Sequence, residues 1–441
     1  MHPSRTYAAD SIAKALAEAC ADVREGTAAD ALGDGPGVVP AFVALSGSTA
    51  EAAAVLRVAA WHELAVVPRG GGSRLGWGTP PSRCDVLVDM AQMDAVLEHA
   101  SGDLVARLQA GARMGDVADL LATAGQEIAL DVPAAATAGG VVASGLAGPR
   151  RLRYGSPRDL LIGITIVLAN GTVAKSGGKV VKNVAGYDLG KLFAGSAGTL
   201  GLITEVTFRL HPLPATRAFV RAEFGASAVA AAGDAVAAAA NSSLIASAVE
   251  LSRPSAGGPL LVSVLLEGSA DGVTARARGM ADLLAAAGAA GSVAEVSQAP
   301  PPWWPGTPGA PEALLAGDGT LVRVSFWVSA LAQVLDAIDA AGREAGIAPS
   351  VAGSAGAGVL YVSCPPGSPE ASAGFVAALR AALGTARGSV AVLAAPAEVR
   401  AALAGRGGMA GSVPSLSLMR AVKDQFDPGH RMSPGRFPEE I

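Results

Sequence analysis

The sequence predicts an α+β protein built from more than one domain. A chain of 441 residues is too long for a single small hydrophobic core. Strand-like and helix-like apolar patterns alternate in two separate stretches, residues 39–110 and 215–410. Between them, residues 131–214 are studded with glycine, and the two prolines of His211-Pro212-Leu213-Pro214 predict a boundary between two domains.

The first third of the chain reveals its elements through apolar runs and caps. Residues 1–38 are predicted to form a helical N-terminal extension, because the segment has the pattern of an amphipathic helix. It is not a signal peptide, since it carries acidic residues and lacks an apolar core. Ser48 is placed to cap the next helix, with Glu51 completing a capping box. In chain order, we predict strands at Val39–Leu45, Leu64–Pro68, Asp85–Asp89 and Leu104–Ala110, and helices at Ala50–His62 and Met114–Ala124.

The rest of the chain predicts antiparallel pairing and a second domain. Asn170-Gly171 is a hairpin-turn dipeptide between two strand patterns, and residues 215–410 predict an α+β domain with an antiparallel sheet. Leu418–Phe437 is predicted as a helix followed by a proline- and glycine-containing tail. The predicted strands are Ile162–Leu168, Thr172–Lys175, Leu202–Leu210, Pro259–Leu266, Leu321–Trp327 and Val359–Cys364, the helices are Ala275–Ala287, Ser329–Ala345 and Glu370–Leu383, and Pro300–Pro311 is a surface loop.

Composition and absent motifs argue against several classes of function. A net charge of −5 argues against a nucleic-acid partner, and no window holds the roughly 20 apolar residues of a membrane-spanning helix. We therefore expect a cytoplasmic protein, peripheral to a membrane only through partners. The five histidines are dispersed and the three cysteines form no C-x-x-C pair, so we expect no metal site or iron–sulfur cluster. Rossmann, Walker A and G-x-S-x-G motifs are absent.

A strand that ends in three glycines is the first feature that carries chemistry. Pro68-Arg69 closes an apolar run and is followed at once by Gly70-Gly71-Gly72-Ser73. Consecutive glycines let the chain turn tightly and point several backbone N–H groups into one concavity, which suits phosphate oxygens. Arg69 would add positive charge. A plain glycine-rich turn is the alternative that this motif alone leaves open.

Two further segments follow before residue 160. Small residues around Gly139-Gly140, from Asp131-Val132-Pro133 to Ser144-Gly145, would permit close approach of a flat or anionic ligand. A loop packed tightly on a strand is the alternative. The segment Gly148–Asp159 holds four arginines, which in an acidic protein would attract an anion or an acidic partner surface, unless they form a solvated basic loop.

Two more glycine-rich segments complete the series. Gly177–Leu189 carries two lysines and an asparagine before a tight turn, and Asp188 is placed to cap the helix that follows. Gly195–Glu205 is a glycine-spaced turn that leads into a strand, for which a structural bend is the alternative. Four glycine-rich segments that each close a strand or open a helix together predict an extended ligand with a pyrophosphate and a flat ring system.

These motifs resemble the PCMH-type FAD-binding domain of the vanillyl-alcohol-oxidase superfamily. Within it, the chain is most similar to the FAD-binding E subunits of bacterial glycolate oxidases, mainly through Gly148–Pro214. The tail, from Leu418 to Arg436, resembles the closing L-K…F-D-P…N-P-G-R pattern, with Ser433 where asparagine is usual. The resemblance covers roughly residues 39–214 and 416–437, and its motifs are Pro68–Ser73, Ala136–Gly145, Gly155–Asp159, Lys182–Leu189 and Gly198–Glu205.

The resemblance implies a fold, a cofactor and a set of site residues. A two-subdomain FAD-binding domain would occupy 39–214, an α+β cap domain 215–410, and a tail over 411–441 would return to the flavin domain. Main-chain amides of the glycine loop would hold the FAD pyrophosphate, and Lys182–Asp188 would lie near the flavin ring. The implied cofactor-binding residues are Arg69, Gly70, Gly71, Gly72, Ser73, Pro133, Thr137, Gly139, Gly140, Ser144, Lys182, Asn183, Gly186, Tyr187, Asp188, Gly198, Gly201 and Ile203.

Two departures from the family pattern bear on the chemistry. Some members attach the flavin to a histidine of the glycine loop, but this loop has Ser73 there and neither Cys nor His, so we expect non-covalent FAD. Members that oxidise 2-hydroxy acids usually carry cap-domain histidines as metal ligands or base, whereas residues 215–410 contain none. His430 is the only downstream histidine, and a surface position is the simpler interpretation. The catalytic residues stay unassigned.

Three functions remain open. The first is an FAD-binding subunit of a glycolate or other 2-hydroxy-acid oxidoreductase complex, partnered by a catalytic D-type flavoprotein subunit and an iron–sulfur subunit. The second is a self-sufficient FAD-dependent alcohol or hydroxy-acid dehydrogenase that uses Tyr or Arg residues such as Arg253 or Arg323. The third is a degenerate flavin fold that acts as an assembly partner, against which the intact glycine segments weigh.

Overall fold

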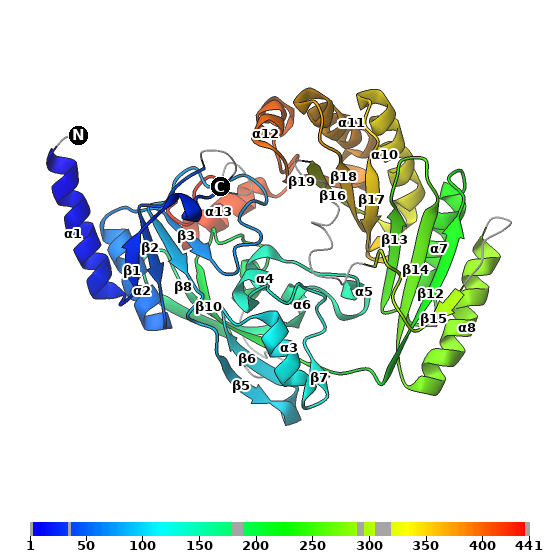
Figure 1. The fold of residues 1–441 in the computed structure, drawn as a ribbon, viewed down its shortest axis with the longest axis horizontal. Helices are drawn as coiled ribbons and strands as arrows, with labels where there is room; N and C mark the ends of the chain where they lie inside the picture. Colours follow the sequence, from blue (N-terminus) through cyan, green and yellow to red (C-terminus); the bar gives the residue numbers. More distant parts are fainter. Residues whose placement is uncertain (1–2, 34–36, 179–187, 289–294, 305–318, 437–441) are drawn as a thin grey trace.

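The computed structural model describes residues 3–33, 37–178, 188–288, 295–304 and 319–436. These residues form two lobes that lie side by side (Figure 1). The first lobe contains the chain up to residue 214 together with the C-terminal tail, and the second contains residues 216–410. Each lobe has its own main hydrophobic core. The mixed helices and sheets confirm the predicted α+β class.

A four-stranded sheet forms one part of the first lobe, in the order β1-β2-β4-β3. The strands β2, β4 and β3 run parallel, and β1 adds an antiparallel edge. The Ser48 hydroxyl accepts a hydrogen bond from the Glu51 N–H as predicted, whereas the Glu51 carboxylate accepts one from Gly47 rather than from Ser48. The elements are α1 (Pro3–Ala19), β1 (Val23–Glu25), η1 (Ala28–Asp30), β2 (Phe42–Leu45), α2 (Thr49–Trp61), β3 (Val66–Arg69) and β4 (Val86–Asp89).

The N-terminal segment is more closely integrated than the predicted extension over residues 1–38. Val23–Glu25 pairs with β2, and the Asp30 carboxylate reaches Arg69 at the end of β3. Residues 23–30 therefore belong to the first lobe, and the boundary predicted after residue 38 does not separate two structural units. A strand of three residues is too short to show alternation in the sequence.

The second sheet of the first lobe is antiparallel, in the order β5-β6-β10-β8-β9. The strands β8 and β9 form the hairpin predicted around Asn170-Gly171, where Gly171 has φ +80°. Helix α4 was not predicted, because its alanines and glycines show little apolar periodicity. The elements are β5 (Val96–Ala100), β6 (Val105–Gln109), α3 (Met114–Ala122), β7 (Gln126–Glu127), α4 (Ala138–Ser144), α5 (Arg151–Tyr154), α6 (Pro157–Leu160), β8 (Leu161–Val167), β9 (Val173–Gly177), η3 (Leu189–Phe193), β10 (Leu202–Arg209) and β11 (His211–Pro212).

An eight-stranded sheet builds the second lobe, in the order β15-β12-β14-β13-β17-β18-β16-β19. Neighbouring strands of this sheet pair antiparallel throughout, which confirms the predicted antiparallel sheet. Its elements are β12 (Thr216–Phe224), α7 (Val229–Asn241), β13 (Ala248–Arg253), β14 (Leu260–Gly268), α8 (Ala270–Ala287), β15 (Glu295–Ser297), β16 (Thr320–Phe326), α10 (Leu331–Ala345), β17 (Ser350–Gly353), η5 (Ala355–Ala357), β18 (Val359–Cys364), α11 (Pro369–Arg387), β19 (Gly388–Ala394) and α12 (Ala397–Leu403).

Alternation along these strands sorts the second-lobe sheet into two faces. Val322, Val324 and Leu251 belong to the core that α7, α8, α10 and α11 help to build. The residue between the two valines, Arg323, points to the opposite face, which is turned toward the first lobe (Figure 1). Along these strands, every second residue therefore faces the space between the lobes, as Arg323 does.

The C-terminal tail returns to the first lobe beside β3. Helix α13 spans Leu416–Phe426 and is followed by a tail with Pro428, Pro434 and Gly435, in agreement with the helix and tail predicted within Leu418–Phe437. Asp427 precedes Pro428, which disfavours helical backbone, and Ser433 has φ +45°. Beyond the helix, the chain pairs with Val66, whose N–H donates to Arg431 and whose carbonyl accepts from Ser433, both at 2.8 Å.

An ion-pair network joins the two lobes. The Arg150 side chain, 6 % exposed, donates from Nε to Asp131 and from Nη1 to Glu127, each at 2.7 Å. From the second lobe, Glu267 lies 3.4 Å from Arg150 and accepts from Arg217 at 2.9 Å. Burial alone would lower the pKa of Arg150, but Asp131 and Glu127 raise it above its ordinary value. The network keeps these buried charges paired and fixes how the lobes meet.

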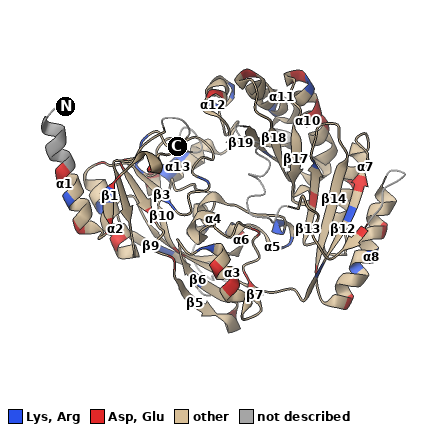
Figure 2. Ribbon diagram, viewed as in Figure 1, with Lys and Arg blue, Asp and Glu red and all other residues tan. Residues whose placement is uncertain are grey.

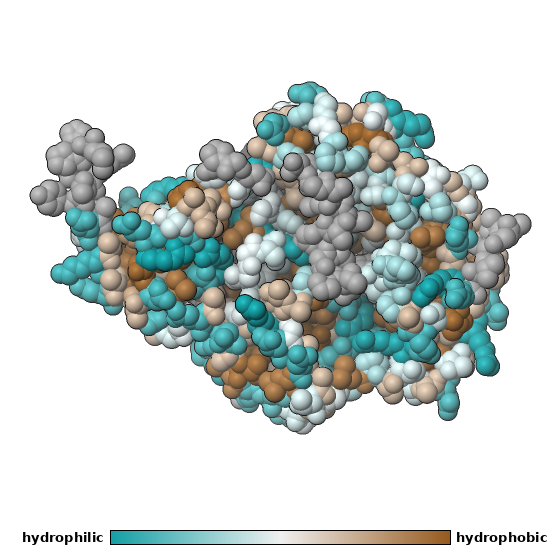
Figure 3. Space-filling model, viewed as in Figure 1, coloured by the Kyte–Doolittle hydropathy of each residue, from teal (hydrophilic) through white to brown (hydrophobic). Residues whose placement is uncertain are grey.

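The surface carries mixed charge and scattered apolar residues. The ribbon of Figure 2, coloured by residue type, shows charged residues spread over the outer helices and basic residues on α5, between the lobes. On the face seen in Figure 3, apolar residues form small separate patches. Among the helices that the structure describes, none combines the length and hydropathy that a bilayer crossing requires.

Candidate functional site

A cavity of about 490 Å³ lies where the two lobes meet. Its lining residues come from segments far apart in the sequence. The first lobe contributes the end of β3 with the loop that follows, the helix α4, and the turn before β10. The second lobe contributes Arg323 of β16, Tyr361 of β18 and Ala391–Leu393 of β19, and the tail contributes Arg436. A concave site between two domains is where ligands are usually bound.

The glycine loop forms one wall because side chains would not fit there. A Cβ atom on Gly70 would lie 2.2 Å from the Thr137 hydroxyl oxygen, and one on Gly71 would lie 2.9 Å from the Ala135 carbonyl oxygen. Gly72 has φ +75°, a conformation that glycine adopts without strain. Gly70, Gly71, Gly72 and Ser73 all line the cavity.

Arg69 lines the cavity but does not offer the free charge that the sequence suggested. Its guanidinium lies 2.7 Å from an Asp89 carboxylate oxygen and 3.1 Å from one of Asp30. Two carboxylates thus neutralise its charge and hold the start of the loop. Arg24 and Thr27 also bind Asp30, and these bonds, led by that from Arg24, hold the Asp30 pKa well below its ordinary value. Arg69 is a positioning residue for the loop.

Helix α4 forms the second wall, and its N-terminus adjoins the glycine loop. Thr137, Gly139, Gly140 and Ser144 line the cavity there. A Cβ on Gly139 would lie 2.7 Å from that of Ala110, so only glycine lets α4 pack this closely on the sheet. The Thr137 hydroxyl oxygen is buried and has no hydrogen-bond partner among the described residues. Buried polar groups are usually hydrogen-bonded, so a bound ligand could supply the missing partner.

The turn before β10 supplies the third wall. Gly198, Gly201 and Ile203 line the cavity, and Gly198 has φ +78°. A Cβ on Gly198 would lie 3.2 Å from the Pro68 ring and 3.3 Å from the Ser433 hydroxyl of the tail. The turn is therefore held between β3 and the C-terminal tail, which links the tail to the shape of the cavity.

The remaining implied residues fall outside this set. Pro133 does not line the cavity; its carbonyl accepts from the Ala136 N–H at 2.9 Å and closes the turn before α4. Asp188 does not line it either, and it makes no capping bond, because its carboxylate pairs with Lys191 at 3.3 Å beside the 3₁₀ turn η3. Lys182, Asn183, Gly186 and Tyr187 lie outside the described residues.

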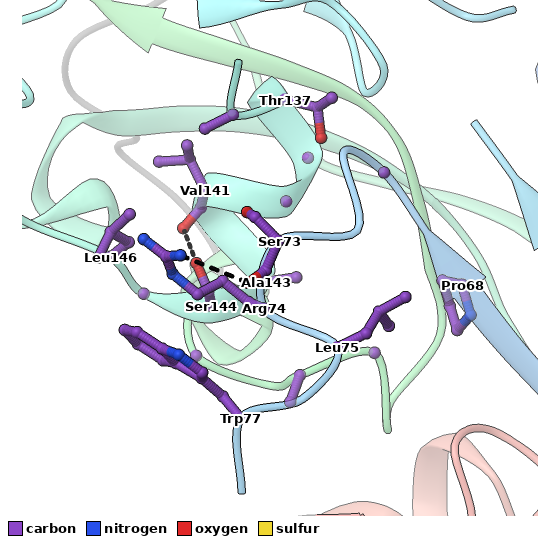
Figure 4. A pocket seen from close by; sticks show the side chains of 18 of the residues that line it. Pro68, Ser73, Arg74, Leu75, Trp77, Thr137, Val141, Ala143, Ser144 and Leu146 are labelled. Carbon is purple, nitrogen blue, oxygen red and sulfur yellow. Dashed lines mark hydrogen bonds between the residues drawn. The ribbon is translucent and has the colours of Figure 1, made fainter. Parts of the chain in front are cut away.

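The loop after Ser73 and the tail close another side of the cavity (Figure 4). The Arg74 guanidinium stacks 4.3 Å from the Trp77 ring, facing Val141 and Ser144 of α4. Arg436 donates to the carbonyls of Arg74 and Leu75 at 2.8 and 2.9 Å. Burial lowers the pKa of Arg74 and of Arg436 to about 10, so both stay charged at neutral pH.

The second lobe presents one cation, Arg323, and one phenol, Tyr361, to the cavity, and Arg151 of the first lobe lies beside them. Arg323 and Tyr361 are cross-strand neighbours on β16 and β18, and Arg151 of α5 donates to the Tyr361 hydroxyl at 3.3 Å. Desolvation and the like charge of Arg151 lower the pKa of Arg323, which Tyr361 raises. Arg253, proposed together with Arg323, points instead to the helix-covered face and pairs with Asp339 at 2.6 Å.

The described lining is strongly basic. Six arginines line the cavity, whereas no aspartate, glutamate, histidine or cysteine does so within the described ranges. Arg151 and Arg158 come from the arginine-rich segment, which the sequence flagged as a possible anion site without assigning residues. No local sequence motif marked Tyr361 or Trp77 as a residue of the site. The alternation of β18 predicts only that Tyr361 shares a face with Ser363.

Comparison with known proteins identifies the first lobe. Residues 40–177 match a family described as an FAD binding domain. The chain is 36 % identical over 181 residues to glycolate oxidase subunit GlcD of Bacillus subtilis, covering 41 % of this chain and 38 % of that protein. It is 34 % identical over 178 residues to D-lactate dehydrogenase [cytochrome] 1 of Saccharomyces cerevisiae, covering 40 % and 30 %. The matched part thus spans about a third of each relative.

Solved structures share the whole fold at low sequence identity. A p-cresol methylhydroxylase with bound substrate aligns with a TM-score of 0.73 and 16 % identity, covering 97 % of this chain and 96 % of that one. An alkyldihydroxyacetonephosphate synthase aligns with a TM-score of 0.66 and 18 % identity, covering 90 % and 78 %. These alignments extend the likeness in fold to the second lobe.

The cavity fits the cofactor named by the matched family. Main-chain N–H groups of the glycine loop suit a pyrophosphate, and the Thr137 hydroxyl, which has no partner among the described residues, offers a hydrogen bond. The basic lining suits the two phosphates. Residues 40–177 match the FAD binding domain family, and this match together with the relatives indicates FAD as the cofactor of the chain.

Proposed function

We propose that the chain is an FAD-dependent oxidoreductase subunit that serves the oxidation of a small 2-hydroxy acid. The observation that carries this proposal is the cavity itself, which joins the FAD binding domain to a wall of Arg151, Arg323 and Tyr361. When bound, FAD supplies an acceptor for the hydride of an alcohol carbon. Two guanidinium groups and a phenol beside it would bind and orient a substrate carboxylate.

The FAD is proposed to be held without a covalent bond. Covalent attachment needs a nucleophilic side chain such as histidine or cysteine at the flavin, and the described cavity lining contains neither. Unfolding the holoprotein in acid should release all of the yellow colour into the supernatant after precipitation. Colour that stays with the protein pellet would contradict this part of the proposal.

The described part of the cavity lining contains no histidine, and this supports a role within a complex. Abstraction of the substrate hydroxyl proton needs a base of suitable pKa, and the described lining supplies arginines and Tyr361 only. The partners proposed are a catalytic flavoprotein subunit related to GlcD and an iron–sulfur subunit that receives the electrons. A self-sufficient dehydrogenase is the second candidate, because Arg323 and Tyr361 already face the FAD binding domain.

One experiment separates these functions. The isolated holoprotein is mixed with glycolate or D-lactate without oxygen, and the flavin absorbance near 450 nm is followed. Rapid bleaching by the isolated chain supports the self-sufficient enzyme, whereas bleaching only after the partner subunits are added supports the complex. A chain that binds no FAD after incubation with excess cofactor would contradict both and leave the degenerate assembly partner.

Arg323 gives a direct test of the proposed carboxylate wall, by which we mean Arg151, Arg323 and Tyr361 as the groups that would bind a substrate carboxylate. Replacing it by methionine removes one charge-assisted hydrogen bond, so we expect oxalate to bind the FAD-loaded protein roughly tenfold to a hundredfold more weakly, about 1.4 to 2.7 kcal/mol. Perturbation of the flavin spectrum measures the affinity. R278M is the matched control, because Arg278 is exposed on α8. Equal affinities of R323M and R278M would contradict the carboxylate wall.

A further inference from the structure

A buried carboxyl group lies on the same sheet face as the carboxylate wall. Glu250 belongs to β13 and is 0 % exposed. Neither of its carboxyl oxygens makes a hydrogen bond of ordinary geometry with a described residue, and the hydroxyl of its cross-strand neighbour Ser263 has no partner either. Burial of a charged carboxylate without a partner costs several kcal/mol, so the neutral acid is strongly favoured here.

The register of the sheet relates Glu250 to the cavity. Arg323 pairs with Tyr361, Tyr361 with Ala352, and Ala352 with Ser252. Ser252 and Glu250 are two residues apart on β13, so both point to the face turned toward the first lobe. The short helix α5, which carries Arg151, packs against β13 from that side.

Two charged groups act on Glu250 from neighbouring segments. Burial raises its pKa to about 8, Asp131 adds to the shift, and the Ser354 hydroxyl and Arg151 oppose it. The other charges on elements packed against β13 are engaged elsewhere. Arg153 of α5 donates to the backbone carbonyl of Glu267 on β14, and Tyr154 donates to the Glu267 carboxylate. Arg253 on the helix-covered face pairs with Asp339, and Asp234 of α7 is exposed to solvent.

Arg151 therefore lies between the unpaired carboxyl group of Glu250 on one side and the cavity on the other. Its guanidinium donates to the Gly148 carbonyl at 3.1 Å and to the Tyr361 hydroxyl at 3.3 Å, both neutral acceptors. No carboxylate forms an ion pair with Arg151 in the part of the chain that the structure describes. An ionised Glu250 would attract this guanidinium and compete with an anion in the cavity.

We propose that Glu250 is a positioning residue which, as a neutral acid, leaves the charge of Arg151 to an anionic ligand, so that anion binding is coupled to retention of the Glu250 proton. The inference rests on the proposed function, because it takes the cavity wall of Arg151, Arg323 and Tyr361 as the site of the ligand. It adds a pH dependence that the wall alone does not have.

The direction of the coupling follows from linkage. An anion beside Arg151 disfavours a second negative charge at Glu250, so it raises the proton affinity of that carboxyl group. Below about pH 7 Glu250 is already protonated and binding moves no proton. Near pH 8 to 9 the free protein is partly ionised at Glu250, and binding takes up protons. Affinity for the anion accordingly falls as the pH rises through this range.

Oxalate is a suitable probe, because it has two carboxylates and no oxidisable carbon–hydrogen bond. We expect its affinity for the FAD-loaded wild type to fall on the order of tenfold between pH 7 and pH 9.5, beyond any fall shown by E250Q. Calorimetry at pH 8.5 in two buffers of different ionisation enthalpy should show proton uptake by the wild type and by the control E295Q, whose glutamate is exposed on β15. E250Q should show none.

The outcomes distinguish this inference from the proposed function. Oxalate that binds the wild type, weakens in R323M and takes up no proton at pH 8.5 would overturn the role of Glu250 and leave the carboxylate wall intact. Proton uptake that persists in E250Q would assign it to another group and also overturn the inference. Oxalate that binds at no pH would overturn the wall and, with it, this inference. The wild-type calorimetry decides the matter even if E250Q does not fold.

Discussion

Replacing Gly71 by valine is expected to weaken FAD binding roughly 100-fold, which corresponds to about 2.7 kcal/mol. The Cβ atom alone would lie 2.9 Å from the Ala135 carbonyl oxygen, and a backbone atom cannot move aside as a side-chain terminus can. The glycine loop would therefore move away from the segment before α4. The main-chain N–H groups of residues 70–73 would then no longer converge on one pyrophosphate.

The same loop offers a matched control. Gly76 has open space around its Cβ position, is exposed, and does not line the cavity. G76V should therefore bind FAD within about twofold of the wild type, since surface substitutions away from special features change free energies by about 0.5 kcal/mol or less. Flavin fluorescence quenching on titration of the apoproteins measures both. Similar losses of FAD affinity in G71V and G76V would contradict the prediction, because they would show that the loop tolerates no substitution at all. They would not single out Gly71 as the residue that sets the position of the loop.

The glycine segments show why part of the site could be predicted from sequence. At Gly70, Gly71, Gly139 and Gly198 the backbone approaches another segment more closely than a side chain allows, or adopts a positive φ. Only glycine meets these requirements without strain, so each such position is marked in the sequence by a glycine. The structure brings these residues to one cavity, although the loop, α4 and the turn before β10 are separated by more than 50 residues each.

The charged residues show where prediction fails. Arg69, Arg150 and Arg323 look alike in sequence, yet they have different roles. Arg69 is held by Asp30 and Asp89, Arg150 joins the lobes, and Arg323 faces the cavity without a hydrogen-bond or ion-pair partner among the described residues. Which arginine is neutralised depends on carboxylates that are 19 to 117 residues distant in the sequence. Local patterns contain no information on such contacts. Tyr361 reaches the site through sheet register, which the sequence does not specify either.

Replacing Lys423 by methionine is expected to lower the free energy of unfolding by about 3–5 kcal/mol, because it leaves a buried carboxylate without its cation. Lys423 and Asp427 are both 0 % exposed, and the Lys423 Nζ donates to Asp427 at 2.8 Å. It also donates to the carbonyls of Thr199 at 2.6 Å and Met432 at 2.9 Å. Chemical denaturation of the holoprotein, followed by tryptophan fluorescence, measures the change.

The loss should reach the cofactor site, because the Thr199 carbonyl belongs to the turn that forms the third wall of the cavity. K423M is therefore expected to release FAD at a lower denaturant concentration than the wild type, whereas K14M, whose lysine is exposed on α1, should match it. The double variant K423M/D427N should recover part of the loss, since an asparagine oxygen still accepts from the Met432 N–H but carries no charge. If the double variant is no more stable than K423M, packing of the lysine stem, and not the unpaired carboxylate, holds the tail to the flavin domain.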